Sequence, residues 1–152
     1  MTHEEKLKRL TAAIASEWLS YYSYWYASIV AIGPMYESIS EHFREHAKDE
    51  KEHIDKLVTR LYELGGLPTF DFAELSEISS CPYPTYEENN ECVRILTRQQ
   101  REAEACAVSN YERFIKDLGD TDYVTADLLT ELLSKEYEHL TDMKKAIASL
   151  DR

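Results

Sequence analysis

Apolar residues recur every three to four positions along four long stretches of the chain. This spacing predicts four α-helices, each with one apolar stripe. The expected helices cover residues 2–32, 34–64, 86–118 and 121–150. The stretches end at residues that stop a helix, namely Gly33, then Gly65 and Gly66, then Gly119. Pro34 can occupy the first turn of the second helix, because a proline lacks only the N–H that is unbonded there.

Roughly twenty residues separate the second and third expected helices. Within this segment, residues 71–78 have the pattern of one short helix. Connections in a simple up-and-down bundle are usually about 2–8 residues long. A longer connection allows the third helix to run parallel to the second. We therefore expect an all-α four-helix bundle with one long crossover, formed by residues 1–152 as a single domain.

Six acidic and histidine residues lie on the apolar stripes instead of on the solvated faces. They are Glu17, Glu50, His53, Glu104, Glu136 and His139. A carboxylate that is buried without a partner costs several kcal/mol, so these residues need cations or one another. Four carboxylates alone would repel, whereas two divalent metal ions would balance their charges. Glu and His ligands from four helices are typical of di-iron and di-manganese sites.

These residues belong to a pattern that occurs twice in the chain. A Glu is followed seven residues later by a Tyr, and 32 or 33 residues later by Glu-x-x-His. The two copies comprise Glu17, Tyr24 and residues 50–53, then Glu104, Tyr111 and residues 136–139. Residues i and i+3 share one face of a helix, so each tetrad can direct both side chains into one site. A single Glu-x-x-His is common on helix surfaces, but two in register with apolar stripes favour a metal centre.

The pattern also predicts how the ligands divide between two metal ions. Glu17 and His53 would bind one ion, and Glu104 and His139 the other. Glu50 and Glu136 would then bridge the two.

Other acidic residues near these positions fall off the apolar stripes. Glu102 is the alternative to Glu104, but it shares a face with residues that look solvated. Glu45, Glu52 and Glu138 should be surface charges for the same reason.

Tyr24 and Tyr111 should point inward at similar positions in the two copies. They are either core aromatics or donors of a hydrogen bond to a ligand carboxylate across the bundle, where a phenol could also give up an electron. Asp49 could orient an imidazole through its second nitrogen. The equivalent position before Glu136 is Lys135, which cannot do so.

His42 and His46 extend the inward face of the second helix by one and two turns. They are either a relay for metal uptake or buried or interface histidines, and the second interpretation is favoured. Three cysteines are too few and too irregularly spaced for a disulfide framework or a zinc site.

The formal net charge is −12, and no basic tail is present. This disfavours direct binding to nucleic acid, whose phosphates need Lys and Arg, while an acidic surface suits the concentration of cations. No apolar stretch approaches the ~20 residues of a membrane span, and the charged N-terminus lacks a signal-peptide core. The expected location is the cytoplasm.

Together these residues resemble the ferritin-like superfamily, whose bacterioferritin-type di-iron site uses Glu, Glu-x-x-His, Glu and Glu-x-x-His. The resemblance spans nearly the whole chain, and the stretch from residue 122 to His139 is similar to bacterioferritin. Two departures argue against a bacterioferritin proper. Lys51 stands where the haem-binding methionine would fall, so no haem is expected. Only thirteen residues follow His139, too few for a fifth, cage-forming helix.

The short helix in the crossover resembles instead the Dps mini-ferritins, although those build their iron site between subunits. The combination resembles the Dps-like proteins called thioferritins. Members of that group carry a cysteine pair near the metal site, and Cys81 with Cys106 is the candidate here. Cys92 and Cys106 would lie about 21 Å apart along one helix and could not bond. Three unpaired buried thiols remain the alternative.

The resemblance implies a mini-ferritin that oxidises Fe²⁺ with H₂O₂, or less efficiently with O₂, at a two-iron centre within each subunit. It also implies a hollow homo-oligomeric shell of twelve subunits that stores ferric mineral and protects against oxidative stress. Mn or Zn could occupy the same site. The alternatives are a manganese catalase or a rubrerythrin-like peroxidase without a cage, of which the latter is weakened by the lack of a rubredoxin-like Cys-x-x-Cys. A DNA-shielding protein is disfavoured by the net charge.

Overall fold

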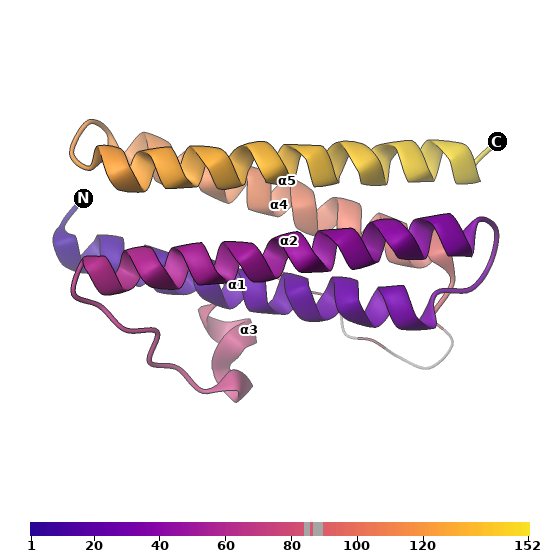
Figure 1. Cartoon of the computed structure of the whole chain (residues 1–152), viewed down its shortest axis with the longest axis horizontal. Coiled ribbons are helices and arrows are strands. Elements are labelled where there is room, and N and C mark those ends of the chain that lie inside the picture. Colours follow the sequence, from indigo (N-terminus) through magenta and orange to yellow (C-terminus); the bar gives the residue numbers. More distant parts are fainter. Residues whose placement is uncertain (84–85, 87–89) are drawn as a thin grey trace.

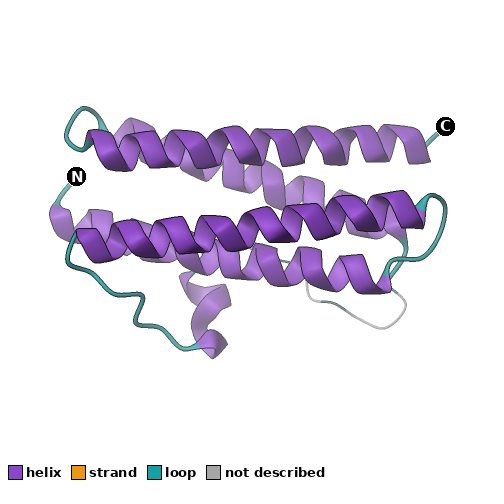
Figure 2. Ribbon diagram, in the orientation of Figure 1, coloured by secondary structure: helices purple, strands orange, loops and turns teal. Residues whose placement is uncertain are grey.

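The computed structural model describes residues 1–83, 86 and 90–152. Helices make up most of the described chain, joined by loops (Figure 2). The long helices are α1 (His3–Val30), α2 (Tyr36–Glu63), α4 (Val93–Leu118) and α5 (Tyr123–Leu150). A short 3-10 turn, η1 (Phe72–Glu74), leads directly into α3 (Leu75–Ile78) within the crossover. The expected all-α architecture is confirmed, including the extra short helix.

The bundle consists of two antiparallel hairpins, α1 with α2 and α4 with α5 (Figure 1). The crossover runs along the outside of α1 and places α3 against it. It returns the chain to the end of the bundle from which α2 began, so α4 runs parallel to α2, as the long connection predicts. Among the described helices, none combines the length and the apolar character needed to span a bilayer.

The third long helix begins seven residues later than the sequence predicts. It starts at Val93 instead of residue 86, and part of the misassigned stretch lies outside the described residues. The reason is a long-range backbone pairing with the turn after α1. The N–H of Ile32 donates to the carbonyl of Glu91, and the N–H of Val93 donates to the carbonyl of Ile32, both at 2.9 Å. Local periodicity carries no signal for such a pairing.

The second helix also begins later than predicted. Pro34 lies in the preceding turn and not in the helix. Met35 precedes the helix in the left-handed region, with φ of 62°, and α2 starts at Tyr36. This left-handed residue turns the chain between the antiparallel helices α1 and α2.

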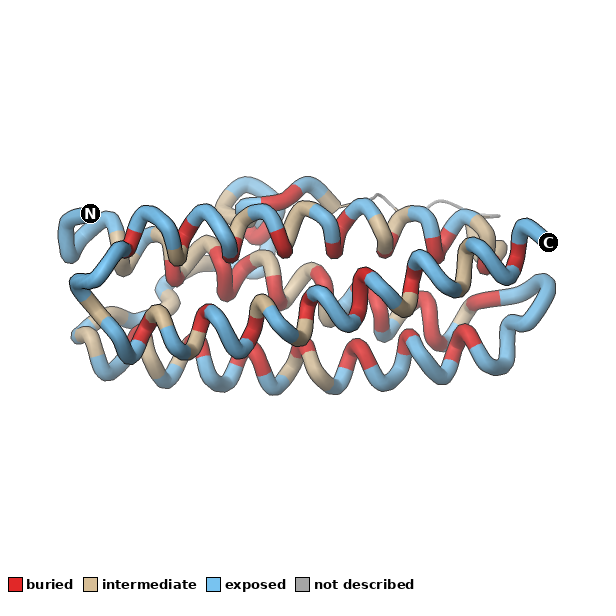
Figure 3. The backbone as a smooth tube through the Cα atoms, turned by 90° about the horizontal axis from the view of Figure 1, so that it is seen from above, coloured by how far each residue is buried: buried red, intermediate tan, exposed pale blue. Residues whose placement is uncertain are grey.

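Buried residues line the inward faces of all four long helices (Figure 3). They form two apolar clusters, one toward each end of the bundle. The first includes Leu10, Ile14, Leu57, Leu118, Leu129 and Leu132. The second includes Tyr24, Ala27, Phe43, Val93, Leu96 and Met143. The polar residues found on the stripes are buried in the layer between these clusters.

A disulfide joins Cys81 in the crossover to Cys106 on α4, with the two Cα atoms 6.0 Å apart. The pair is therefore the one that the resemblance implied, and Cys92 remains a free thiol. The bond closes a loop across 25 positions of sequence. A loop of this length stabilises the folded state by about 3–4 kcal/mol in the chain-entropy view.

Candidate metal centre

Six side chains from the four long helices meet in the middle of the bundle. Each was predicted from the apolar stripes, and each is at least 96% buried. They are Glu17 on α1, Glu50 and His53 on α2, Glu104 on α4, and Glu136 and His139 on α5. Their convergence requires all four helices in register, because no helix supplies more than two of them.

The six residues form two overlapping groups whose potential ligand atoms lie within 4.8 Å of one another. The first group is Glu17, Glu50, His53 and Glu136, and the second is Glu50, Glu104, Glu136 and His139. Glu50 and Glu136 occur in both groups. This is the division that the sequence predicts for two terminal pairs and two bridging carboxylates.

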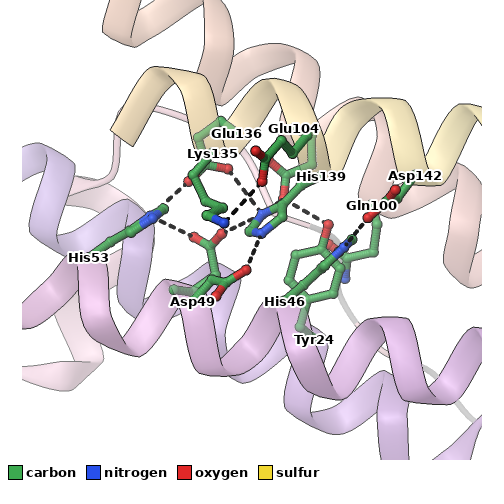
Figure 4. Close-up of polar contacts among 12 residues, drawn as sticks. Tyr24, His46, Asp49, His53, Gln100, Glu104, Lys135, Glu136, His139 and Asp142 are labelled. Carbon is green, nitrogen blue, oxygen red and sulfur yellow. Dashed lines mark hydrogen bonds and ion pairs between the residues drawn. The ribbon is translucent and has the colours of Figure 1, made fainter. Parts of the chain in front are cut away.

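Each shared carboxylate directs one oxygen toward each imidazole, as Figure 4 shows for Glu136. Oε1 of Glu136 lies 3.0 Å from Nδ1 of His53, and its Oε2 lies 3.6 Å from Nδ1 of His139. Oε1 of Glu50 lies 2.9 Å from Nδ1 of His139, and its Oε2 lies 3.9 Å from Nδ1 of His53. A carboxylate in this position can bind two cations held side by side.

The terminal carboxylates each approach one imidazole. Oε2 of Glu17 lies 3.4 Å from Nδ1 of His53. Oε1 of Glu104 lies 3.3 Å from Nδ1 of His139. Both imidazoles therefore present the same nitrogen to a ring of carboxylate oxygens.

The donor set fits two divalent metal ions. Buried polar atoms almost always have a partner, yet every one of these six side chains has at least one buried atom without a hydrogen-bond partner. These atoms are Oε2 of Glu17, Oε1 of Glu50, Nδ1 of His53, Oε2 of Glu104, both carboxylate oxygens of Glu136 and Nδ1 of His139. Carboxylate oxygens and imidazole nitrogens are the donors that iron, manganese and zinc take in proteins.

Burial and the neighbouring charges shift the pKa values of the carboxyls and imidazoles at the centre. Burial, then the charge of Glu136, raises the pKa of Glu50 and of Glu104. Burial would also raise the pKa of Glu136, but the close approach of Glu104 and of both histidines holds it well below its ordinary value. Burial lowers the pKa of His53, but the charge of Glu17 and the close approach of Glu136 outweigh it and raise the pKa to about 10. Protons thus sit where cations would bind, and metal binding must displace them.

The two tyrosines of the repeated pattern donate hydrogen bonds across the bundle, which is the second of the two interpretations that the sequence left open. The hydroxyl of Tyr24 donates to Oε1 of Glu104 at 2.7 Å, and that of Tyr111 donates to Oε1 of Glu17 at 2.6 Å. Each phenol therefore crosses from one hairpin to a carboxylate of the other. Burial and the nearby carboxylates raise the pKa of both phenols, so they remain donors.

Asp49 supports one of the two imidazoles. Its Oδ2 lies 2.9 Å from Nε2 of His139, the ring nitrogen that faces away from the ligand carboxylates. The expected role of Asp49 is confirmed, with the detail that it acts on the histidine of α5 and not on His53 of its own helix. Lys135 pairs instead with Glu138 at 3.0 Å.

The remaining predicted positions separate into buried and exposed residues. His46 is buried, whereas His42 is exposed and does not face inward as its register suggested. Glu102 and the three other off-stripe carboxylates, Glu45, Glu52 and Glu138, are exposed as expected. Lys51 forms an ion pair with Asp55 on the outside of α2.

Sequence reasoning missed two residues near the centre. Asp142 accepts a hydrogen bond from His46, and the available signal was its position three residues after His139 on the same face of α5. Tyr83, in the crossover, lines a cavity of about 80 Å³ together with Glu17 and Glu50. Cys81 lines the same cavity, which is large enough for small molecules such as water. No sequence signal indicates the path of the crossover past the centre.

Comparison with known proteins agrees with this arrangement. Residues 7–152 match the ferritin family, described as a ferritin-like domain. Over 136 residues, the chain is 32% identical to the DNA protection during starvation protein of Pyrococcus furiosus, which covers 90% of this chain and 73% of that protein.

Solved structures show the same fold. A dodecameric thioferritin, the bacterioferritin-related protein from Bacteroides fragilis, superposes with a TM-score of 0.95 at 29% identity, over 100% of this chain and 89% of that chain. Dps from Thermosynechococcus elongatus superposes with a TM-score of 0.85 at 20% identity, over 95% and 90% of the two chains. From its matching sequence and its bundle with a short crossover helix, the chain belongs to the ferritin-like domain family and is a homologue of the Dps proteins.

Proposed function

We propose that this protein is an iron-storage mini-ferritin that oxidises Fe²⁺ at the centre of each subunit. The observation that carries the proposal is the position of Glu50 and Glu136, which direct one oxygen toward each of two imidazoles. Carboxylates shared in this way can bind two adjacent cations. In this proposal each group of four ligands holds one Fe²⁺. In this proposal the iron is the substrate, and the ferric product is stored as mineral.

The proposed ligands divide as the two overlapping groups do. Glu17 and His53 hold one Fe²⁺, Glu104 and His139 hold the other, and Glu50 and Glu136 are shared. Two dipositive ions balance the four carboxylates, which removes the cost of burying them. The same donors would accept Mn²⁺ or Zn²⁺. Haem has no role in this proposal.

The oxidant in this proposal is H₂O₂, or less efficiently O₂. Two Fe²⁺ give one electron each to one H₂O₂, which takes up two protons and becomes two molecules of water. Paired one-electron donors avoid release of a hydroxyl radical, which is the protective part of the function. Tyr24 and Tyr111 hold the terminal carboxylates in place by hydrogen bonds. The cavity beside Glu17 and Glu50 offers a small oxidant a place next to the centre.

The storage role requires a shell, which we propose to be a homododecamer. Three large apolar side chains share one face of α1 and are exposed in the single chain. They are Tyr22 at 51%, Trp25 at 48% and Ile29 at 66% exposure. An apolar patch of this kind marks a surface that another chain covers. The B. fragilis relative is a dodecamer, and size-exclusion chromatography with light scattering separates twelve subunits from one bundle.

Direct coating of DNA is not part of the proposal, although the Pyrococcus relative is named for DNA protection. The net charge of −12 opposes binding to phosphates. Removal of Fe²⁺ and H₂O₂ would protect nucleic acid without contact. A gel-shift assay at low salt that shows tight binding to duplex DNA would contradict this.

The ferroxidase assignment is tested by comparing two variants on one helix. Glu50→Ala removes a shared ligand, whereas Glu52→Ala removes an exposed carboxylate two residues away. We expect Glu50→Ala to slow Fe²⁺ oxidation by more than about 100-fold, because loss of a ligand exceeds the roughly 10–100-fold cost of losing an outer partner. Glu52→Ala should oxidise Fe²⁺ at the original rate, and both variants should keep the original assembly size. Equal rates in the two variants would overturn the assignment.

A further inference from the structure

A second set of potential metal ligands lies next to the centre, on the face that α2 and α5 form. His46 precedes Glu50 by about one helical turn, and His42 precedes His46 by another. Asp142 follows His139 by nearly one turn on α5. Ligand atoms of His42, His46 and Asp142 lie within 4.8 Å of one another. Neither of the two groups at the centre includes any of these three residues.

The three ligand atoms already approach the spacing of a bound ion. Nε2 of His46 lies 2.9 Å from Oδ2 of Asp142, and Nδ1 of His42 lies 3.9 Å from the same oxygen. Donors placed about 2.0–2.2 Å from a tetrahedral ion lie roughly 3.4 Å apart. The two observed distances therefore lie on either side of the donor separation expected around a bound ion. His42 can close the difference by turning, because its side chain is 49% exposed.

The residues around His46 hold its ring in one orientation before an ion binds. Its ring is buried, stacks on the ring of His139 with centroids 4.0 Å apart, and meets the ring of Tyr24 edge-on at 4.9 Å. These contacts hold the ring so that Nε2 faces Asp142 (Figure 4). Little side-chain entropy remains to be lost at His46 when an ion binds.

We propose that His42, His46 and Asp142 form a third cation site for a divalent transition-metal ion such as Zn²⁺, Co²⁺ or Fe²⁺. Two imidazoles with one carboxylate favour these ions over Mg²⁺ and Ca²⁺, which prefer oxygen donors. Water completes the coordination, because His42 and Asp142 reach the surface. The site binds its ion independently of the oxidation proposed for the centre. Because His46 stacks on His139, the ion would lie beside the centre.

Titration with Co²⁺ tests the site, since cobalt bound to imidazole is coloured and its stoichiometry is measurable by calorimetry. We expect three Co²⁺ per chain in the unaltered protein. His42→Ala and Asp142→Asn should each lose one Co²⁺ and keep the other two. His3→Ala is the matched control, because it removes an exposed histidine on α1, and it should keep all three. His46 is left intact, because its ring packs in the core.

A Glu50→Ala variant separates this proposal from the function proposed above. It should lose Co²⁺ from the centre and keep the ion that depends on His42. In crystals of the unaltered protein soaked in Zn²⁺, an anomalous peak should lie among the three side chains. Two Co²⁺ in the unaltered protein, three in His42→Ala, or no anomalous peak beside His46 would each overturn the third site. None of these results would bear on Fe²⁺ oxidation at the centre.

Discussion

The two hairpins of the bundle supply the same residues to the centre but surround them differently. The first hairpin, α1 with α2, provides Glu, Tyr and Glu-x-x-His, and the second, α4 with α5, repeats the series. Each tyrosine bonds the terminal carboxylate of the opposite hairpin at nearly the same distance, 2.7 and 2.6 Å. The proposed ligands and their immediate hydrogen-bond donors are therefore almost two-fold symmetric.

The residues that surround the proposed ligands are not symmetric. His139 is supported by Asp49, whereas the position equivalent to Asp49 on α5 is Lys135. Four residues before the Glu of each tetrad, α2 has the buried His46, and α5 has the buried Leu132. His46 stacks on His139, whereas Leu132, at the equivalent position of α5, belongs to an apolar cluster.

This difference suggests that the two metal positions have unequal affinities. A carboxylate behind a ligating imidazole fixes the ring and raises the basicity of the metal-facing nitrogen. Only His139 has such a partner among the described residues. We therefore expect the position at Glu104 and His139 to bind its ion more tightly than the position at Glu17 and His53.

The largest expected effect comes from removing one terminal ligand at a time. Glu17→Gln and Glu104→Gln should each slow Fe²⁺ oxidation by more than about 100-fold, since the reaction needs both positions. The remaining Zn²⁺ affinities should differ, because Glu17→Gln leaves the supported His139 position intact. Competition with a fluorescent chelator measures both. Equal residual affinities in the two variants would show that the two metal positions do not differ.

A smaller effect is expected from the residue behind His139. Asp49→Asn should weaken Zn²⁺ binding at this position by about 10–100-fold, the usual cost of losing an outer partner of a metal-bound histidine. Lys135→Ala is the matched control and should change the affinity by less than about 2-fold, because Lys135 contacts Glu138 at the surface. Calorimetric titration gives both values. If Lys135→Ala has as large an effect as Asp49→Asn, the asymmetry does not arise from the carboxylate.

The first and last long helices also differ in their N-terminal caps, which affects stability. Thr2 caps α1 in an exposed capping box, whereas Asp122 caps α5 and pairs with Lys6 and Arg60. Burial alone would raise the pKa of Asp122, but hydrogen bonds from Thr125 and Lys6 hold the pKa well below its ordinary range. This stabilisation is complete above an unfolded-state pKa of about 3.9 and is lost as the pH falls below it.

Asp122→Ala should therefore lower the free energy of unfolding by about 1–3 kcal/mol at pH 7, because it removes a cap and the partner of two cations. Thr2→Ala should cost about 0.5–1 kcal/mol. Urea unfolding at pH 7 and at pH 3 measures the difference. The deficit of Asp122→Ala should shrink at pH 3, and a deficit that stays constant would show that the ion pairs are not its source.

Much of the fold and the candidate centre can be predicted from sequence because both depend on local periodicity. Glu17 and Glu104 are recognisable because a helix of 3.6 residues per turn places them on apolar stripes. The start of α4 is not recognisable, because the backbone of Ile32, sixty positions earlier, bonds to Glu91 and Val93. The contact of Asp49 with His139 likewise depends on the packing of α2 against α5.

We propose above that two metal ions bind side by side within one bundle. Anomalous diffraction from crystals soaked in Zn²⁺ or Fe²⁺ tests it most directly. We expect two peaks between His53 and His139, roughly 3.5–4 Å apart, as in other two-metal sites. Both ions should contact Glu50 and Glu136 of the same chain. A single peak in this region, or a pair that lies between two subunits, would contradict a two-metal centre within one chain.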